Sequence, residues 1–419
     1  WYNPAGLADA KTSLLADFSW LRFTSEYTRV LRVVDADNTV RYVTNDPVQG
    51  SSPVIPLPTL AGAYNFGDQK QWTFAAAAYA PYAAIVTYPD TVNGKPSPAR
   101  YALGSFNGSA LIFTGVYLAW KPIEEFRVGL GLDALVGQYQ STVTYSVSPP
   151  DRLLAAPEQP EYDANTSFKA GPIFAPSASL GATYVPMQQL RFGASFALPR
   201  VVSAPSTFQV RLPSAAIFDN AHIDGSSAHV RFKLPAILRA GVEGRPMENL
   251  RVEFAYEREF WSIHDAIEIT PENVSFGGIA GLPNRIPIPS IRYPRNFQDS
   301  SSFRLGGEYT TKLFGGYVYD FRAGISYETT AVPPAYLSLL TIDMNKTTLS
   351  FGGSVHVTDH WRFDLVYAHL FAQTVNVSPD DAQIPRVNPI PGNVDLEKVN
   401  GGTYSAAADV FGVGAQYTF

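Results

Sequence analysis

Acidic and basic side chains alternate with apolar ones over residues 250–259, which read LRVEFAYERE. Carboxylates and guanidinium groups this close together could perform acid–base catalysis, because neighbouring charges shift one another's pKa values. They could instead form ion pairs between adjacent strands, where opposite charges at matching positions attract. We favour the ion pairs, because strands that carry arginine and glutamate at matching heights usually pair them without any acid–base task.

The same alternation recurs in the runs 227–244, 301–309, 317–328 and 361–371. Successive side chains of a strand point to opposite faces, so each run predicts an apolar surface backed by an ionic one. The predicted ionic set, to which Asp343 between two of the runs also belongs, consists of Arg231, Lys233, Arg239, Glu243, Arg251, Glu253, Glu257, Arg304, Glu308, Asp320, Arg322, Asp343, Arg362 and Asp364.

The other residues that could do chemistry form no recognisable site. The six histidines are scattered, without a His-x-x-x-His pair or an acid cluster at metal-ligand spacing. The chain has no cysteine and no Gly-x-Ser-x-Gly nucleophile motif, although enzymes built on barrels do not need that motif. A formal net charge of −6 argues against nucleic-acid binding. We therefore predict no enzyme activity, metal or cofactor, with an outer-membrane enzyme as a disfavoured alternative.

Strand-like runs account for most of the chain. Fourteen are predicted, at approximately 14–33, 58–66, 71–82, 103–120, 126–144, 168–184, 190–203, 227–244, 249–261, 301–311, 317–328, 346–356, 361–374 and 403–419. Short polar turns at 67–70, 121–125, 185–188, 245–248, 312–316 and 357–360 alternate with much longer Pro-, Ser- and Asn-rich segments. An even strand number with short turns at one end and long loops at the other is typical of a transmembrane barrel. We expect an all-β, 14-stranded antiparallel transmembrane β-barrel over residues 14–419, in preference to soluble β-sandwiches.

In such a barrel, the apolar face meets lipid and the charged face meets the lumen. Residues 72–79 and 110–117 depart from this pattern, because they are apolar on both faces. An apolar inner wall needs either a plug or a hydrophobic ligand to cover it. We identify Phe74 and Phe113 as candidate contacts for the tail of an amphipathic cargo. Lys233, together with Arg239, is the candidate partner of an anionic head group, because lysine is less committed to bidentate pairing than arginine.

Residues 273–294 place several isoleucines in a predicted long loop. Exposed apolar residues often mark a binding surface, so Ile286 and Ile288 are candidates for capturing a hydrophobic ligand. The same residues could instead pack against neighbouring loops as a lid, which we slightly favour.

The N-terminal sequence Asn3-Pro4-Ala5-Gly6-Leu7-Ala8 resembles the signature of the bacterial outer-membrane long-chain fatty acid transporter family, the FadL family, which includes channels for toluene and related hydrocarbons. Later stretches agree in order, among them 234–242, LPAILRAGV, and 303–309, FRLGGEY. The final AQYTF is similar to the Phe-ended last strand that the outer-membrane assembly machinery reads. The resemblance extends over essentially the whole chain.

The resemblance implies that residues 1–13 are the remainder of a longer lumenal hatch, with Asn3, Pro4 and Ala5 as its motif. It also implies a kinked strand with a lateral opening at Pro81 and Tyr82, since proline cannot donate to a strand ladder. Ordinary strand termination there is an equal alternative. The family's Pro-Asp-x-Asp-Arg stretch is matched by residues 342–346, IDMNK, which retain Asp343 but replace the second acid and the arginine.

The resemblance further implies passive uptake of hydrophobic molecules across the outer membrane of a Gram-negative bacterium, with long-chain fatty acids as the expected cargo. Aromatic hydrocarbons are the alternative cargo. A general porin is less favoured, because its lumen would be charged on all sides. The expected partners are the cargo, the lipid bilayer with its lipopolysaccharide, and the assembly machinery, and the protein is expected to be a monomer.

Overall fold

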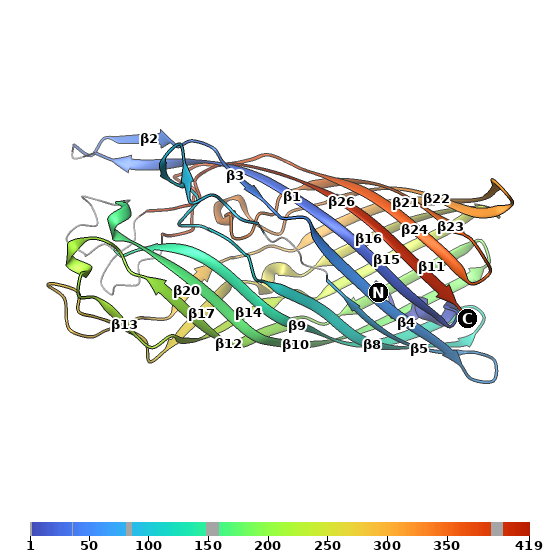
Figure 1. Ribbon diagram of the computed structural model, residues 1–419. Coiled ribbons are helices and arrows are strands. Elements are labelled where there is room, and N and C mark those ends of the chain that lie inside the picture. Colours follow the sequence, from blue (N-terminus) through green and yellow to red (C-terminus); the bar gives the residue numbers. More distant parts are fainter. Residues whose placement is uncertain (1, 36, 81–85, 148–158, 387–396) are drawn as a thin grey trace.

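The computed structural model describes residues 2–35, 37–80, 86–147, 159–386 and 397–419. Within these ranges, fourteen antiparallel strands close into a barrel, as predicted, and four of them are interrupted and carry two labels each (Figure 1). Their order is β1 (Ser13–Val34), β4 (Ile55–Phe66), β5 (Trp72–Tyr79), β8 (Ala110–Ile123), β9 (Phe126–Ser146), β10 (Asp163–Met187), β11 (Leu190–Ala197) with β12 (Arg200–Arg211), β14 (Ser227–Leu234) with β15 (Ile237–Met247), β16 (Leu250–Glu259) with β17 (Ala266–Glu272), β20 (Ile291–Pro294) with β21 (Ser300–Leu313), β22 (Tyr317–Glu328), β23 (Lys346–His356), β24 (Trp361–Ala372) and β26 (Gly402–Thr418).

The remaining elements are short. Small strands extend the barrel or pair within the long connections: β2 (Val40–Thr44), β3 (Val48–Ser51), β6 (Thr91–Val92), β7 (Lys95–Pro96), β13 (His222–Asp224), β18 (Ser275–Gly277), β19 (Ile286–Pro287) and β25 (Val375–Val377). Short 3-10 helices are η1 (Pro4–Asp9), η3 (Pro160–Tyr162), η4 (Ala216–Phe218), η5 (Trp261–Ile263) and η6 (Pro334–Tyr336). No helix in the described ranges has the length and apolar character to cross a membrane.

The first and last strands close the barrel. β1 and β26 pair continuously from Ser13 opposite Thr418 to Arg29 opposite Gly402. The predicted short turns are confirmed, because they join β4 to β5, β8 to β9, β10 to β11, β15 to β16, β21 to β22 and β23 to β24. These turns lie at the end of the barrel that holds the C-terminus, and the long connections lie at the other end (Figure 1).

The two faces of the ionic strands have the predicted orientation. On β16, Val252 and Phe254 are exposed on the outer surface, whereas Glu257 is buried inside. On β22, Phe321 and Ile325 are exposed outside. The outer surface therefore offers apolar side chains to lipid, as a transmembrane barrel requires.

The predicted inward orientation of Arg231 and Lys233 is wrong. Run 227–244 is two strands, because Pro235 and Ala236 separate β14 from β15, and proline cannot donate to the ladder. On β14, Val230 is buried in the lumen opposite buried Ala204, so the alternating positions Arg231 and Lys233 are exposed on the outside. The break shifts the inward and outward alternation by one residue between β14 and β15. Such a shift moves each side chain to the opposite face of the wall.

The prediction that Phe74 lines the lumen is also wrong. Its side chain is 45% exposed on the outer surface, and the flanking Thr73 and Ala75 are buried inside. Phe74 lies opposite Leu118, which is also exposed, whereas Tyr79 lies opposite buried Phe113. Because this strand is apolar on both faces, its pattern does not reveal which face is inward.

Gly137 permits a close approach between β9 and β8. Its φ is +135°, a conformation that side chains disfavour, and a Cβ at this position would collide with the carbonyl oxygen of Ala110. The residue lies opposite Leu111 in the ladder, at the end of β8 nearer the long connections.

We predict that Gly137→Ala destabilises the barrel by about 1–3 kcal/mol, since it combines backbone strain with this collision. The measurement is the temperature at which the folded form loses its faster electrophoretic mobility. Gly244→Ala is the matched control, because a Cβ there meets no atom within 4 Å. Equal transition temperatures for the two variants would contradict the prediction.

Candidate functional site

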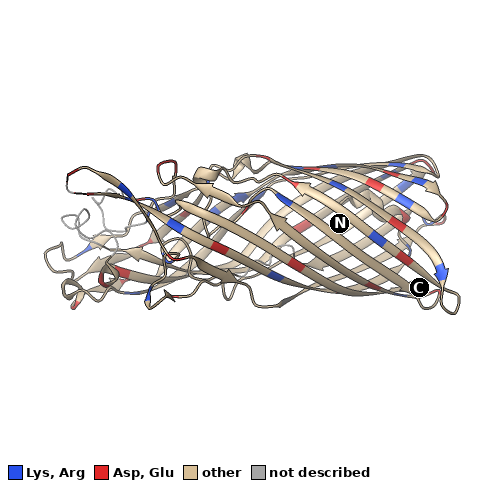
Figure 2. Cartoon of the chain, turned by 90° about the horizontal axis from the view of Figure 1, so that it is seen from above, with Lys and Arg blue, Asp and Glu red and all other residues tan. Residues whose placement is uncertain are grey.

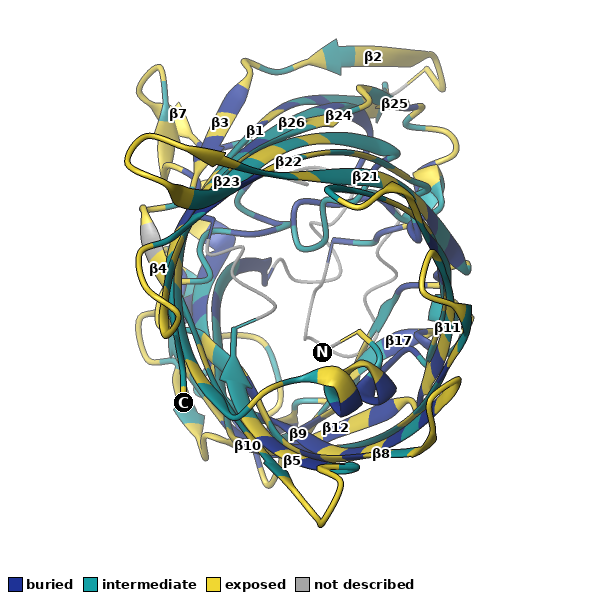
Figure 3. Cartoon of the chain, turned by 90° about the vertical axis from the view of Figure 1, so that its right-hand side faces the viewer, coloured by how far each residue is buried: buried dark blue, intermediate teal, exposed yellow. Residues whose placement is uncertain are grey.

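The N-terminal segment lies against the inner wall of the barrel, near β8 and β9 (Figure 3). The Asn3 side chain caps the 3-10 turn η1 by accepting a hydrogen bond from the backbone N–H of Ala5, at 2.9 Å. Asn3 Nδ2 donates to the carbonyl oxygen of Ala182 on β10, at 3.0 Å. Pro4 occupies the first position of the turn, where its fixed φ fits and its missing N–H is not needed. The Asn-Pro-Ala motif thus fixes a turn and attaches it to the wall.

Glycines on the wall make room for this segment. A Cβ on Gly129 of β9 would collide with the backbone of Pro4 and Ala5, and a Cβ on Gly181 of β10 would collide with the Asn3 side chain. Ala5 is completely buried as a result. The wall and the segment are therefore complementary in shape at the motif itself.

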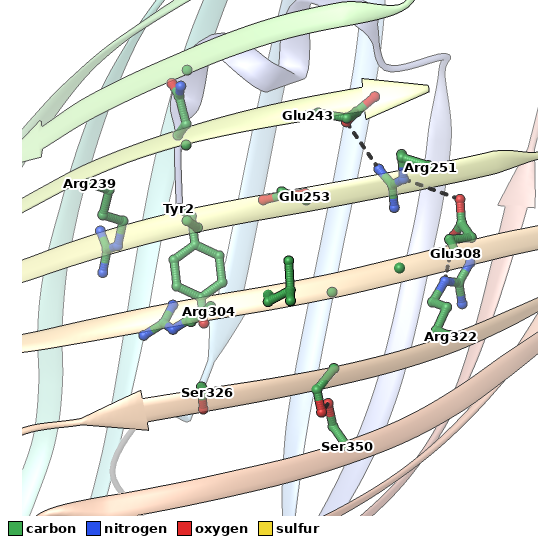
Figure 4. A pocket seen from close by; sticks show the side chains of 18 of the residues that line it. Tyr2, Arg239, Glu243, Arg251, Glu253, Arg304, Glu308, Arg322, Ser326 and Ser350 are labelled. Carbon is green, nitrogen blue, oxygen red and sulfur yellow. Dashed lines mark hydrogen bonds and ion pairs between the residues drawn. The ribbon is translucent and has the colours of Figure 1, made fainter. Parts of the chain in front are cut away.

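Ion pairs and aromatic contacts hold both ends of the segment. Asp9 accepts from Arg127 of β9 at 3.0 Å and pairs with Arg191 of β11 at 3.1 Å. The Tyr2 ring lies 5.0 Å from the guanidinium carbon of Arg239 and 5.2 Å from that of Arg304 (Figure 4). Such cation–π contacts attract because the ring face carries negative charge.

Ion pairs cover the lumen wall beside Tyr2 and form an ionic network on neighbouring strands (Figure 4). Glu257 pairs with Arg239 and, at 2.6 Å, with Arg304. Arg251 bridges Glu243 and Glu308, each at 3.4 Å. The network continues along the neighbouring strands through Arg322–Glu308 (2.6 Å), Arg322–Asp320 (3.2 Å), Arg322–Asp364 (3.7 Å) and Arg362–Asp364 (3.1 Å).

The predicted ionic residues on β15 to β24 are thus brought together, with two exceptions. Glu253 faces the same cavity, but no ion pair to it occurs in the described residues. Asp343 lies apart from the network and pairs with Lys346 at 2.7 Å, which is the residue that stands where the FadL-family pattern has arginine. The pairs partly neutralise one another, as expected for a structural wall. They surround a cavity of about 690 Å³ that Tyr2 and Asn3 also line. In Figure 2, charged positions lie along the barrel strands as well as in the loops.

An apolar wall lines the lumen on the long-loop side of this network. Its buried residues come from β8, β9, β10, β12 and β14 and are Phe113, Leu135, Phe168, Ala170, Ile173, Ala175, Val202, Ala204, Val230 and Leu234. Phe113 therefore faces the lumen, as predicted, and the guanidinium carbon of Arg200 lies 4.5 Å from the centre of its ring. Arg200 also pairs with Asp133.

Arg295 is a buried cation that the sequence pattern does not reveal. It is only 2% exposed, and its Nε has no hydrogen-bond partner in the described residues. Its electrostatic neighbours are Tyr139 of β9 and Tyr293 of β20. Because β9 and β20 are not adjacent in the barrel, this cluster crosses the lumen.

Burial dominates the electrostatics around this cluster. It lowers the pKa of Arg295 to about 10 and the pKa of His264 to about 4. At neutral pH, His264 is therefore uncharged and Arg295 keeps its proton. No carboxylate in the described ranges lies within ion-pair distance of the Arg295 guanidinium. An internal positive charge without an acid is costly, and an anion would offset that cost.

The loop candidates have a different environment. Ile286 is 7% exposed in an apolar cluster with Val147, Tyr162, Phe218, Phe276 and Ile279, and Ile288 packs against this cluster. The loops thus pack together, which is the lid interpretation. Pro81 and Tyr82 lie outside the described residues. No group of three or more metal-binding side chains occurs in the part of the chain that the structure describes.

We predict that Gly181→Val displaces the N-terminal segment, because the added side chain occupies the space of Asn3. Since the chain has no cysteine, Ala5→Cys gives a single-thiol reporter. A water-soluble maleimide should label this buried thiol several-fold faster in the Gly181→Val background. Gly244→Val is the control background, and equal labelling rates in both would contradict the prediction.

The chain is similar to known proteins over its whole length. The family model of the outer membrane protein transport proteins (OMPP1/FadL/TodX) matches residues 1–419. The solved structure of a Pseudomonas aeruginosa FadL homologue has a TM-score of 0.75 at 14% identity, over 100% of this chain and 93% of that chain. Two toluene transporters also have similar structures. TodX of P. putida has a TM-score of 0.61 at 15% identity, over 100% of this chain and 92% of its own. TbuX of Ralstonia pickettii has a TM-score of 0.58 at 18% identity, again over 100% and 92%. No curated protein matches the chain.

Identities this low establish the shared barrel fold alone, whereas the family match spans every residue of the chain. The chain therefore belongs to the OMPP1/FadL/TodX family of outer-membrane β-barrel channels for hydrophobic substrates.

Proposed function

We propose that this protein is a passive uptake channel for long-chain fatty acids. The observation that carries the proposal is Arg295, a buried guanidinium inside the lumen with no acidic partner in the described residues. A long-chain carboxylate supplies the missing anion, and charge-assisted hydrogen bonds to a guanidinium are among the stronger ones in proteins. A neutral hydrocarbon has no group that needs this charge.

The surroundings of Arg295 suit both parts of such a cargo. In the same cluster, the Tyr293 hydroxyl donates to the Tyr145 hydroxyl oxygen at 3.2 Å, which leaves the Tyr145 hydroxyl as a further donor to a carboxylate. Trp261 packs against the apolar wall and also against the cluster that contains Phe297, two residues from Arg295. An alkyl chain against this wall gains about 0.8 kcal/mol for each buried CH₂ group.

The ionic cavity beside Tyr2 separates this region from the end with the short turns. A hydrophobic chain gains little from a wall of paired charges, so release needs movement of the N-terminal segment. Tyr2 and Asp9 attach that segment to arginines on four strands, β9, β11, β15 and β21. We infer that Asn3, Pro4 and Ala5 keep the segment closed and that its displacement opens the exit.

A lateral exit through the barrel wall is the second proposed route. It is based on the short length of β5, whose pairing with its neighbours ends early. Its pairing with β4 and β8 ends at Tyr79, opposite Thr59 and Phe113. The next described pairing on this side is the bridge of Thr87 with Ser51 and Ser105. Cargo that reaches Phe113 would meet the wall at this position.

We predict that Arg295→Gln weakens palmitate binding about tenfold, equivalent to about 1.4 kcal/mol, and leaves toluene binding unchanged. Both affinities are measured by titrating the detergent-purified barrel. Lys233→Met is the matched control and should alter neither affinity, because Lys233 is exposed on the outer surface. Arg295→Lys should recover part of the palmitate affinity, since it restores the charge without the bidentate geometry.

The other outcomes of this titration have clear meanings. Equal losses of palmitate and toluene affinity would make Arg295 a structural residue. An unchanged palmitate affinity would place the carboxylate elsewhere and favour aromatic hydrocarbons as cargo. Retained heat-modifiable electrophoretic mobility shows that each variant remains folded.

A further inference from the structure

The apolar outer band of the barrel ends in charged residues on the side of the long loops. On β1, exposed Phe18 is followed by outward Arg22, and on β16 exposed Phe254 is followed by Arg258. On β12 and β14, exposed Val201 lies opposite Lys233, and the next outward pair is Ser203 opposite Arg231. This change from apolar to charged side chains marks the level at which lipid head groups begin.

Arg231 and Lys233 form a pair of cations at this boundary. Both are exposed on β14, two residues apart on the same face, and therefore roughly 7 Å apart along the strand. β12, β14 and β17 lie in the half of the barrel that carries the long loops (Figure 1). The two side chains therefore project from the wall into the layer between acyl chains and solvent.

The acids near this pair are engaged by another cation. Glu268 lies opposite Arg231 in the ladder, but its carboxylate is 3.9 Å from the Nε of Arg292. Arg292 also pairs at 2.8 Å with Asp265, an acid that interacts electrostatically with Lys233. In the described residues, neither Arg231 nor Lys233 has a carboxylate within 4 Å. The lumenal arginines of the network, by contrast, all pair with acids.

We propose that Arg231 and Lys233 bind phosphate groups of lipopolysaccharide in the outer leaflet of the membrane. Two exposed cations at the level of the head groups, neither with a carboxylate within 4 Å in the described residues, are complementary to a phosphorylated glycolipid. The guanidinium offers two parallel donors to one phosphate, and the ammonium acts as a compact point charge on the same or the adjacent phosphate. Ser203 and His229, which share a 2.7 Å hydrogen bond on the same outer surface, offer polar contacts to the sugar.

The test compares lipid A that carries its phosphates with chemically dephosphorylated lipid A. Each is titrated into the detergent-purified barrel, and bound lipid is counted by native mass spectrometry. We expect the wild-type protein to bind the phosphorylated form at least fivefold more tightly. The double variant Arg231→Gln/Lys233→Gln should lose that preference and keep the wild-type affinity for palmitate, so this test is independent of the proposed cargo.

Arg32→Gln/Arg41→Gln is the matched control. These two cations are also exposed at the long-loop side, but they pair with Asp380 at 3.0 Å and Asp35 at 2.9 Å, so the control should keep the preference. Inorganic phosphate at the lipid concentration should not compete. Any one of three outcomes would overturn the proposal. The preference persists in the Arg231/Lys233 double variant, it is lost equally in the control, or free phosphate abolishes it.

Discussion

The pairing of β1 with β26 is the constraint on which the rest of this structure depends. Backbone N–H and C=O groups have no water to bind inside a bilayer, so a sheet that spans it needs a partner for each edge. Closing the ladder from Ser13–Thr418 to Arg29–Gly402 provides that partner. Closure also creates an enclosed inner surface, and the chemistry of the protein follows from how that surface is covered.

The inner surface is covered in two different ways. On β15 to β24, arginines and carboxylates pair with one another across adjacent strands. On β8 to β14, apolar side chains pack together, and glycines at 129 and 181 leave room for the N-terminal segment. The segment contacts both regions, through Asp9 and Tyr2. Displacement of the segment would break these ion pairs and ring contacts, which is the basis of its proposed role as a gate.

Interruptions in the strands decide where individual charges point. Pro235 separates β14 from β15 and places Lys233 outside, although Arg239 six residues later lies inside. The break between β20 and β21 contains Arg295 and turns it into the lumen beside Tyr139. Proline and irregular backbone at these positions thus place one buried cation in the lumen, with no acid paired to it in the described residues, and two exposed cations on the outer surface.

The sequence alone determined the class of fold, the fourteen strands, their turns and the charged face of β16, β21, β22 and β24. Those features depend on local periodicity and turn chemistry, which are visible in a single strand.

The sequence did not determine the inward face of β5, because both faces of that strand are apolar and Phe74 fits either. The sequence pattern placed Arg231 and Lys233 on the wrong face of the barrel wall. Alternation that is followed continuously through Pro235 does not reveal the one-residue shift at that position. Arg295 lies in a Pro-rich segment without periodicity, and its burial depends on Tyr139, more than 150 residues away in the chain. Only closure of the barrel brings such residues across the lumen. The tertiary structure alone therefore decided that Arg295 is buried with no acid paired to it in the described part of the chain.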